Sequence, residues 1–461
     1  MPAAKLGVFM LAMLITGAID SIRNLPAAAL FGPSLIFFFF LASLLYLIPS
    51  ALISAQLAAT SGNKGGIYHW TRATLGDHAA FLAIWLQWFS NLIWFPTILS
   101  FIAGSTALLI SPTLGENRVW MVSAILAVFW LVTLINLKGI RISARFASFC
   151  TITGLIIPIS VIILLAGIWI VAGHPLQIHF TLNTLIPDFT HSQNWVSLTA
   201  IMTAFNGVEL AAVHAKDIHN PQKTFPLALL ISILLILFTM IGGALAIAIV
   251  LPQNQISLVG GVLQAFNNFF AQWHLGWLMP VMTAMIIIGS AGGIISWVIS
   301  PARGLLQAGK EGYLPDFLTR ENRYGVAYNL LICQAMIVSV FCMVFFLLPS
   351  INGSYWFLMA LALQMYMLMY VILFIIGIVA HYRLPKKPRG FRIPGGTPGI
   401  WVVCLMGLTG CCLTEFIGFL PPGQINIGSV FRYELMFISG IVAALVPVLF
   451  FLGLSGTQQK K

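Results

Sequence analysis

Long apolar segments alternate with short polar ones along this chain of 461 residues. Segments such as Ser34–Ile53 and Leu227–Leu251 carry no charged residue. Roughly 20 mainly apolar residues suffice for a helix to cross a bilayer core of about 30 Å. Strands of a membrane β-barrel would instead alternate apolar and polar residues in segments of about ten. The pattern therefore predicts an all-α integral membrane protein.

Apolar segments of this kind define twelve expected transmembrane helices. They are, approximately, 6–31, 34–58, 79–110, 119–137, 147–173, 194–213, 226–251, 275–302, 327–348, 354–381, 399–420 and 433–455. No connection between them is long enough or polar enough to form a soluble domain. We therefore expect a single transmembrane domain that covers residues 1–461.

The composition agrees with a membrane protein. Hydrophobic residues make up 60% of the chain and charged residues 7%, whereas about a quarter of the residues in ordinary globular proteins are charged. A net charge of +11 would indicate nucleic acid only on a soluble fold with clustered basic faces. We expect the lipid bilayer as surroundings and no nucleic-acid partner. The six cysteines lie in apolar segments without metal-ligand spacing, so we expect neither a metal nor a cofactor.

The basic residues indicate how the chain is oriented, because cytoplasmic connections are enriched in Lys and Arg. With the N-terminus inside, 19 of the 22 Lys and Arg residues fall in inner segments. The outer connections hold only Arg118 and Arg432, and Arg23 lies within the first span. We therefore expect both termini to be cytoplasmic in a multi-pass protein of the plasma (inner) membrane.

Three acidic residues fall at membrane depth, namely Asp20, Glu209 and Glu415. A charge inside a span costs about 2.5–3.5 kcal/mol on insertion scales, so such residues are candidates for function. Glu415 lies near the outer end of a span, where contact with lipid headgroups explains it. Glu209 is the stronger candidate for exchanging or sensing protons. Its alternative role is a buried hydrogen bond to a neighbouring helix.

The first span is interrupted by polar and helix-breaking residues between Thr16 and Pro26. Gly, Asp, Ser, Asn and Pro disfavour a continuous helix and offer ligands, which favours a broken helix that lines a cavity. The candidate substrate-binding residues here are Thr16, Gly17, Ala18, Ile19, Asp20 and Ser21. Asp20 is also a candidate for proton coupling. An ion pair between Asp20 and Arg23, spaced i, i+3, is the alternative.

The sixth span is interrupted in a similar way, because Thr203, Asn206 and Gly207 precede Glu209. Breaks at corresponding places in two halves of a chain indicate an inverted-repeat transporter with its substrate near the membrane midplane. For Gly207 alone, helix–helix packing is the alternative. The expected parts are repeat one, repeat two and two extra helices, at 6–173, 194–381 and 399–455.

Other spans carry polar or aromatic residues that could line the same cavity. Gln87 and Asn91 in the third span are spaced i, i+4, as are Tyr366 and Tyr370 in the tenth, so each pair shares a helix face. Trp297 lies in the eighth span. Aromatic side chains can hold an ammonium group by cation–π contact. Packing, or a place in the interfacial belt, is the alternative for each.

Several short motifs occur in order along the chain. They are Gly65–Tyr68, Gly207–Glu209, Asn220–Pro221 with Pro226, Ser296–Trp297 followed by Pro301–Gly304, Phe391–Gly396 and Phe419–Pro422. Together these motifs resemble those of the amino acid–polyamine–organocation (APC) transporter superfamily, most closely its glutamate/GABA antiporter-like branch. The resemblance implies a LeuT-like fold of two inverted five-helix repeats plus two C-terminal helices, with helices one and six unwound at the substrate.

The resemblance also implies roles for particular residues. Glu209 matches the family acid that is tied to proton sensing or coupling. Trp297 matches an aromatic residue that closes over the substrate, and Phe205 matches a neighbour of the break in helix six. Tyr366 and Tyr370 resemble a tyrosine pair in the tenth helix of the branch.

The first break departs from the family pattern. A Gly-Ser-Gly sequence, whose backbone amides receive a substrate α-carboxylate, is replaced here by Ile19, Asp20 and Ser21. Because an ionised Asp20 would repel that group, either Asp20 is neutral, or Arg23 compensates it, or the ligand is cationic at that end. The glutamate/GABA member has an acid where this chain has Gly293, which argues against glutamate/GABA specificity.

The residues and the resemblance together predict a secondary active transporter of amino acids or derived amines. We expect an exchanger that works by alternating access with pH-sensitive gating. A proton- or Na⁺-coupled symporter is the first alternative, and a non-transporting membrane sensor or a channel is the second. We expect no enzyme, because the chain contains no His-Glu-x-x-His motif, no Walker loop and no intramembrane acid pair on one helix.

Overall fold

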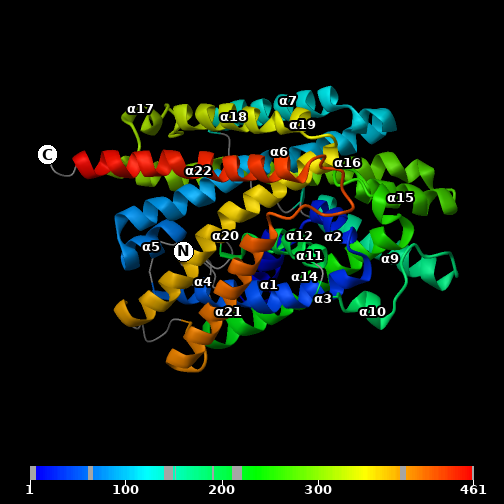
Figure 1. The fold of residues 1–461 in the computed structure, drawn as a ribbon, viewed down its shortest axis with the longest axis horizontal. Coiled ribbons are helices and arrows are strands. Elements are labelled where there is room, and N and C mark those ends of the chain that lie inside the picture. The colour runs from blue at the N-terminus through cyan, green and yellow to red at the C-terminus, as the bar shows by residue number, and fades with distance from the viewer. Residues whose placement is uncertain are drawn as a thin grey trace.

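The computed structural model is a bundle of helices (Figure 1). It describes residues 7–60, 66–139, 149–150, 152–188, 190, 192–209, 221–384 and 391–458. Within these ranges the chain forms helices joined by turns and no β-strand, which confirms the all-α expectation. The buried apolar side chains form a connected core that extends from Leu11 to Val448.

The helices have the following bounds. The α-helices are α1 Val8–Ile19, α2 Leu25–Ala29, α3 Leu35–Ala42, α4 Ile48–Thr60, α5 Ile67–Leu75, α6 Asp77–Ile110, α7 Arg118–Leu137, α9 Ile157–Val171, α10 Leu182–Leu185, α11 Ser192–Trp195, α12 Ser197–Ala204, α14 Pro221–Val250, α15 Gly261–Gln272, α16 Met279–Ala308, α17 Asp316–Thr319, α18 Tyr328–Cys342, α19 Val344–Leu347, α20 Ile351–Arg383, α21 Gly396–Ile417 and α22 Val430–Gln458. The π-helical turns are Ser43–Leu47, Ile152–Ile156 and Gly309–Tyr313. The 3₁₀ turns are Ile22–Asn24, Gly32–Ser34, Pro112–Glu116, Gln253–Gln255 and Gly276–Leu278.

Many of these helices can cross a membrane. Among the described residues, 9 helices are long and apolar enough, and the bent pair Val8–Gly17 and Ile22–Ala29 would make a tenth. The expected eighth span lies in α16, which is helical throughout. The expected sixth span begins with α12, but 210–220 lie outside the described residues. The structure therefore describes a multi-pass helical protein, and the number of twelve spans stays a prediction.

Helices α6 and α20 lie at the centre of the bundle. In their most apolar 18-residue segments, 72% of the residues of α6 and 67% of those of α20 are buried, against 17% in α22. Figure 1 shows α20 crossing the middle of the bundle, while α7 and α18 lie side by side along one edge. Side chains on α6 and α20 are therefore held by packing on most sides.

Buried polar side chains join the central helices. Trp88 of α6 donates its indole N–H to Gln334 of α18 at 3.0 Å, and Gln334 donates to the carbonyl of Val298 on α16 at 3.1 Å. Gln364 of α20 donates to the carbonyl of Thr414 on α21 at 3.0 Å. Because lipid offers no alternative partner, such bonds help to fix how the helices pack in a membrane.

Among the described residues, two helices longer than two turns occupy segments that the sequence assigned to connections. α5 lies between α4 and α6, and α15 lies between α14 and α16. Each mixes apolar and polar residues, so neither has the long apolar stretch that reveals a span. Figure 1 shows α5 and α15 at opposite ends of the bundle.

A polar cluster ties α5 to the π-helical turn that follows α16. Arg72 pairs with Asp77 at 2.6 Å and also with Glu311, and Tyr68 donates a hydrogen bond to Glu311. Burial and the carboxylate of Glu311 raise the pKa of the Tyr68 hydroxyl well above its usual value. The Arg72 and Asp77 side chains are each 43% exposed, so each ion pair contributes only about 0–1 kcal/mol to stability.

Two glycines let α16 approach the fifth span closely. A methyl group on Gly154, in the turn Ile152–Ile156, would overlap the backbone of Gly289 on α16, and a methyl group on Gly289 would overlap Gly154 in return. Small residues allow such close helix contacts in membrane proteins. Both glycines also line the central cavity described below, so this contact shapes the cavity wall.

We predict that Gly289→Ala lowers the thermal unfolding temperature of the purified protein, because the added methyl group overpacks the helix contact at a cost of about 1–3 kcal/mol. Gly167→Ala in α9 is the matched control, since a side chain there meets no atom within 4 Å. The control should unfold at the wild-type temperature or slightly above it. Equal unfolding temperatures for the two variants would contradict the overlap.

Candidate functional site

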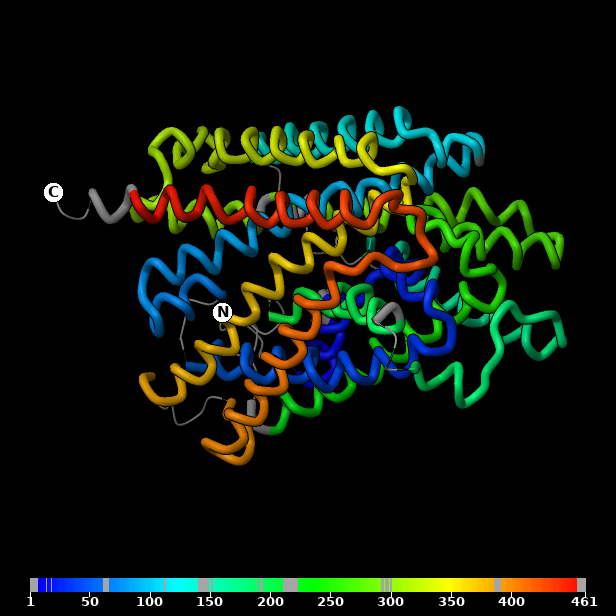
Figure 2. The backbone as a smooth tube through the Cα atoms, in the orientation of Figure 1, coloured from blue at the N-terminus to red at the C-terminus, as the bar shows by residue number. Residues whose placement is uncertain are grey.

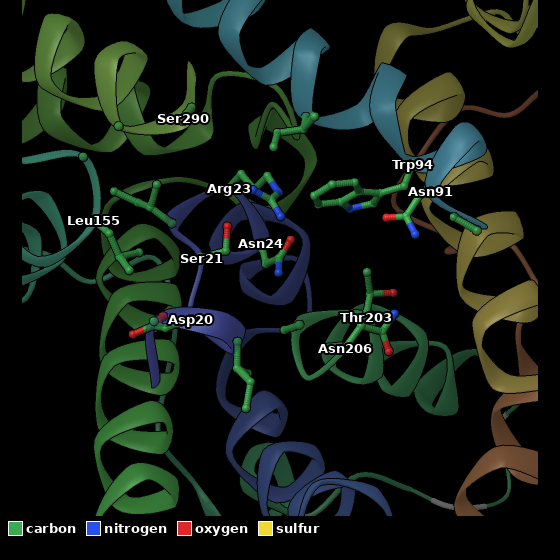
Figure 3. Close-up of a pocket in the computed structure, with 18 of the residues that line it drawn as sticks. Asp20, Ser21, Arg23, Asn24, Asn91, Trp94, Leu155, Thr203, Asn206 and Ser290 are labelled. Atoms are coloured by element: carbon green, nitrogen blue, oxygen red, sulfur yellow. The ribbon is translucent and has the colours of Figure 1, made fainter. Parts of the chain in front are cut away.

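The two helix interruptions border one polar cavity (Figure 3). Its volume is about 170 Å³. On this measure a water molecule needs about 10–15 Å³, so the cavity has room for roughly 11–17 water-sized groups. Its wall combines residues of the turns Ile22–Asn24 and Ile152–Ile156 with residues of α1, α6, α12, α16 and α20.

The first interruption lies between α1 and α2. α1 ends at Ile19, where the amide of Asp20 donates to the carbonyl of Thr16 at 2.8 Å. The backbone of Asp20 and Ser21 is then extended, and the chain resumes a helical course at Ile22 with a bend of 46°. Asp and Ser compete with the helix backbone for hydrogen bonds. The sequence therefore ends the helix inside the bundle, at the cavity wall.

The second interruption follows α12, which ends at Ala204. Phe205, Asn206 and Gly207 form a turn, and Gly207 has a φ of 104°, which a residue with a side chain rarely adopts. In Figure 2 the dark-blue first span and the green α12 lie side by side at the centre of the bundle. Both interruptions therefore expose backbone to the same cavity.

Asn206 is held in place by a tyrosine from another helix. The Tyr46 hydroxyl donates to Oδ1 of Asn206 at 2.7 Å. Tyr46 belongs to the π-helical turn Ser43–Leu47, which locally changes the direction of side chains between α3 and α4. Its ring also meets the ring of Tyr370 edge-on, with centroids 4.8 Å apart.

Glu209 is buried behind the cavity wall with 1% of its surface exposed. The Tyr366 hydroxyl donates to its Oε1 at 2.6 Å, and the Tyr370 hydroxyl donates to its Oε2. The Gln87 side chain donates to Oε1 at 3.0 Å. These three donors occupy three of the roughly four acceptor sites of a carboxylate. Among them, Tyr366 also lines the cavity, so it connects the cavity to the acid.

Asp20 faces away from the other charged residue of its span. Its Oδ2 accepts a hydrogen bond from the Thr239 hydroxyl of α14 at 2.8 Å, while its Oδ1 is buried without a hydrogen-bond partner. Figure 3 shows Asp20 on the α14 side of the cavity and Arg23 on the opposite side, toward Trp94. Within the described ranges, the Asp20–Arg23 ion pair considered from the spacing is not formed.

Arg23 instead lies over Trp94 of α6. Its guanidinium carbon is 4.4 Å from the centroid of the indole ring, a distance typical of a cation–π contact. Both residues line the cavity, as do Asn24, Ser90 and Ser290. None of these five was among the candidate binding residues. The arginine within a span was the signal that could have revealed them, because an intramembrane charge faces a partner or a cavity.

The structure brings together most of the candidate binding residues. Those that line the cavity are Gly17, Ile19, Asp20, Ser21, Asn91, Thr203, Asn206 and Tyr366. Those that surround Glu209 without lining the cavity are Gln87 and Tyr370. Asn91 joins the two groups, because its amide donates to the carbonyl of Gln87 at 2.6 Å.

Three candidates are placed elsewhere. Thr16 is buried in α1, one turn before the break, and Gly207 forms the turn behind Asn206; neither is a cavity residue. Phe205 is fully buried and packs edge-on against Phe39 at 5.7 Å, so it supports the break from the core side. The backbone of Ala18 is part of α1, but its side chain is outside the described part of the chain.

The backbone of Trp297 is part of α16, but its side chain is likewise outside the described part of the chain. Its expected role over the substrate therefore stays a prediction.

A multi-pass helical protein with a central polar cavity between two interrupted helices has the architecture of a membrane transporter. Comparison with known sequences agrees with this class. The chain belongs to the amino acid permease family, whose family model matches residues 6–444. This confirms the membership of the APC superfamily that the motifs indicated, and the protein is a secondary membrane transporter.

Named relatives include transporters from two bacteria. The chain is 39% identical over 446 residues to an uncharacterized transporter of Legionella pneumophila, covering 96% of each chain. It is 30% identical over 449 residues to a glutamate/gamma-aminobutyrate antiporter of Lactococcus lactis, covering 96% of this chain and 89% of the relative. It is 22% identical to a probable agmatine/putrescine antiporter of the same species, covering 80% and 78% of the two chains.

We predict that Tyr370→Phe lowers the thermal unfolding temperature of the purified protein. The substitution removes one donor from a buried carboxylate, and a hydrogen bond to a charged group is worth about 1.5–3 kcal/mol. Tyr328→Phe is the matched control, because the Tyr328 hydroxyl has no hydrogen bond among the described contacts. If both variants unfold at the same temperature, the Tyr370–Glu209 bond does not contribute as described.

Proposed function

We propose that this permease exchanges amino acids, or amines derived from them, by alternating access, with its substrate in the central cavity and with Glu209 sensing or coupling protons. The observation that carries the proposal is that two interrupted helices border one polar cavity. Tyr366, which lines this cavity, donates a hydrogen bond to the buried Glu209. Interrupted helices in corresponding halves of a transporter mark its binding site.

We further propose that two inverted repeats, 6–173 and 194–381, build this site, followed by extra helices at 399–455. Two features support this division. Each proposed repeat begins with an interrupted helix, and each has a short helix after its second span, α5 or α15. Figure 1 shows these short helices at opposite ends of the bundle, as expected when one copy of a fold is inverted relative to the other.

In this proposal both termini lie in the cytoplasm of a cell whose plasma (inner) membrane holds the protein. The distribution of basic residues supports this orientation, because 19 of the 22 Lys and Arg residues fall in segments that would face inward. The cluster of Arg72, Asp77 and Glu311 lies at the end of the molecule that would then be cytoplasmic. Charged clusters of this kind are compatible with the aqueous side of a membrane.

The substrate would occupy the space between Ser21 at the first break and Asn206 at the second, with Asn91 and Thr203 along the wall. Their hydroxyl and amide groups can pair with the polar groups of an amino acid. The names of the relatives support both the exchange mode and the substrate class, since they describe antiporters of glutamate and gamma-aminobutyrate or of agmatine and putrescine.

We predict that uptake requires internal substrate. Purified protein in proteoliposomes should accumulate labelled amino acid or amine when the lumen contains the unlabelled compound, and should do so poorly when the lumen is empty. A panel of L-glutamate, gamma-aminobutyrate, L-ornithine, L-arginine, agmatine and putrescine tests this. Equal uptake into empty vesicles would favour a proton- or Na⁺-coupled symporter, and absence of uptake for the whole panel would favour a channel or a sensor.

We predict that Glu209→Gln flattens the pH profile of exchange. Glutamine keeps the size of the side chain and one acceptor oxygen, but it cannot take up or release a proton. Glu116→Gln, at the exposed end of the turn Pro112–Glu116, is the matched control and should keep the wild-type profile. Initial exchange rates between about pH 5 and pH 8 give the comparison. A wild-type profile in Glu209→Gln would remove Glu209 from proton sensing.

A further inference from the structure

Arg23 is a positive charge at membrane depth that points into the cavity (Figure 3). Its Nε atom is buried and has no hydrogen-bond partner. Among the described residues, the guanidinium group forms no ion pair and no hydrogen bond, and it lies over the ring of Trp94. An intramembrane charge without a partner is costly, so it indicates a function.

The acids closest to the cavity are already engaged with other groups. Glu209 accepts hydrogen bonds from Tyr366, Tyr370 and Gln87. Asp20 accepts one from Thr239 and faces the α14 side of the cavity. No acid in the described part of the protein therefore forms an ion pair with Arg23.

The position of Arg23 is nevertheless well defined. The Tyr355 hydroxyl of α20 donates to the backbone carbonyl of Arg23 at 3.4 Å, and Trp94 of α6 lies under the guanidinium group at 4.4 Å. Contact with the indole ring covers one side of the guanidinium group and leaves its terminal N–H donors available to a ligand in the cavity. An arginine held in this way is ready to bind a planar anion.

We infer that Arg23, held over the ring of Trp94, binds a carboxylate group of the substrate, so that the transporter selects amino acids over amines that lack a carboxylate. This inference rests on the proposed function, because it assigns the substrate class of the same cavity. A guanidinium group binds a carboxylate through two parallel charge-assisted hydrogen bonds. A diamine cannot make these bonds, and its ammonium groups would be repelled.

The remaining wall suits the rest of such a substrate. Asn24, Asn91 and Ser290 are neutral and polar, so they can pair with an amino group without competing for the carboxylate. The unpartnered Oδ1 of Asp20 offers a further acceptor near the first break. The cavity would thus present a cation at one side and acceptors at the other, which matches the charge separation of an amino acid.

The first test uses the wild-type protein and pairs of compounds that differ by one carboxylate. L-Ornithine and putrescine form one pair, L-arginine and agmatine a second, and gamma-aminobutyrate and its amide a third. Competition against whichever labelled compound of the panel is exchanged gives their relative affinities. We expect the acid of at least one pair to bind roughly ten- to hundredfold more tightly, the range expected for a hydrogen-bonded charge pair.

The second test asks whether Arg23 causes that preference. Arg23→Gln should reduce or abolish the acid-over-amine ratio, Arg23→Lys should retain part of it, and Arg432→Gln is the matched control at an exposed arginine. If the Gln variant does not fold, the wild-type pairs still decide the substrate class and Arg23→Lys tests the residue.

The outcomes separate the inference from the proposed function. Exchange with equal affinity for acids and amines, or an unchanged ratio in Arg23→Gln, would overturn the role of Arg23 and leave the exchange function intact. Failure of the wild-type protein to exchange any compound of the panel would overturn the proposed function and the inference with it.

Discussion

Backbone N–H and C=O groups in a bilayer core find no water to pair with, so a membrane helix can be interrupted only where protein or a hydrated cavity replaces the lost bonds. This protein interrupts two helices, at Asp20–Ser21 and at Phe205–Gly207, and both interruptions meet the same cavity. The cavity and the breaks therefore depend on each other. Central packing by α6 and α20 then fixes the wall opposite the breaks.

The charged groups at and behind the cavity wall differ in how many hydrogen bonds the protein provides for them. Glu209 has three donors, Asp20 has one, and Arg23 has an aromatic ring but no hydrogen-bond partner among the described residues. Burial of an unsatisfied charge costs free energy. The number of hydrogen-bond partners therefore distinguishes charged groups that are satisfied within the protein from groups that a ligand would satisfy. Glu209 belongs to the first kind and Arg23 to the second.

Much of the fold could be predicted from the sequence, because long apolar segments of about 20 residues form helices in a membrane. The breaks were also predictable, since Gly17 to Asn24 and Asn206 to Gly207 combine helix-breaking and polar residues. The hydrogen-bond partners of the residues at the breaks could not be predicted from the sequence. Thr239 lies 219 positions from Asp20, and sequence spacing instead suggested Arg23. Short amphipathic helices such as α5 were missed because they lack the apolar length that identifies a span.

The hydrogen bond between Tyr366 and Glu209 links the chemistry of the cavity to that of the acid. While Glu209 is ionised, the Tyr366 hydroxyl donates to it and presents only its oxygen lone pairs to the cavity. A proton on the bonded oxygen of Glu209 would turn that oxygen into a donor, so the Tyr366 hydroxyl would accept from Glu209 and direct its own hydrogen elsewhere. Protonation of Glu209 at Oε1 would therefore change what Tyr366 offers a ligand in the cavity from an acceptor to a donor. In the proposed function, Glu209 can therefore act on the substrate through Tyr366 without touching it.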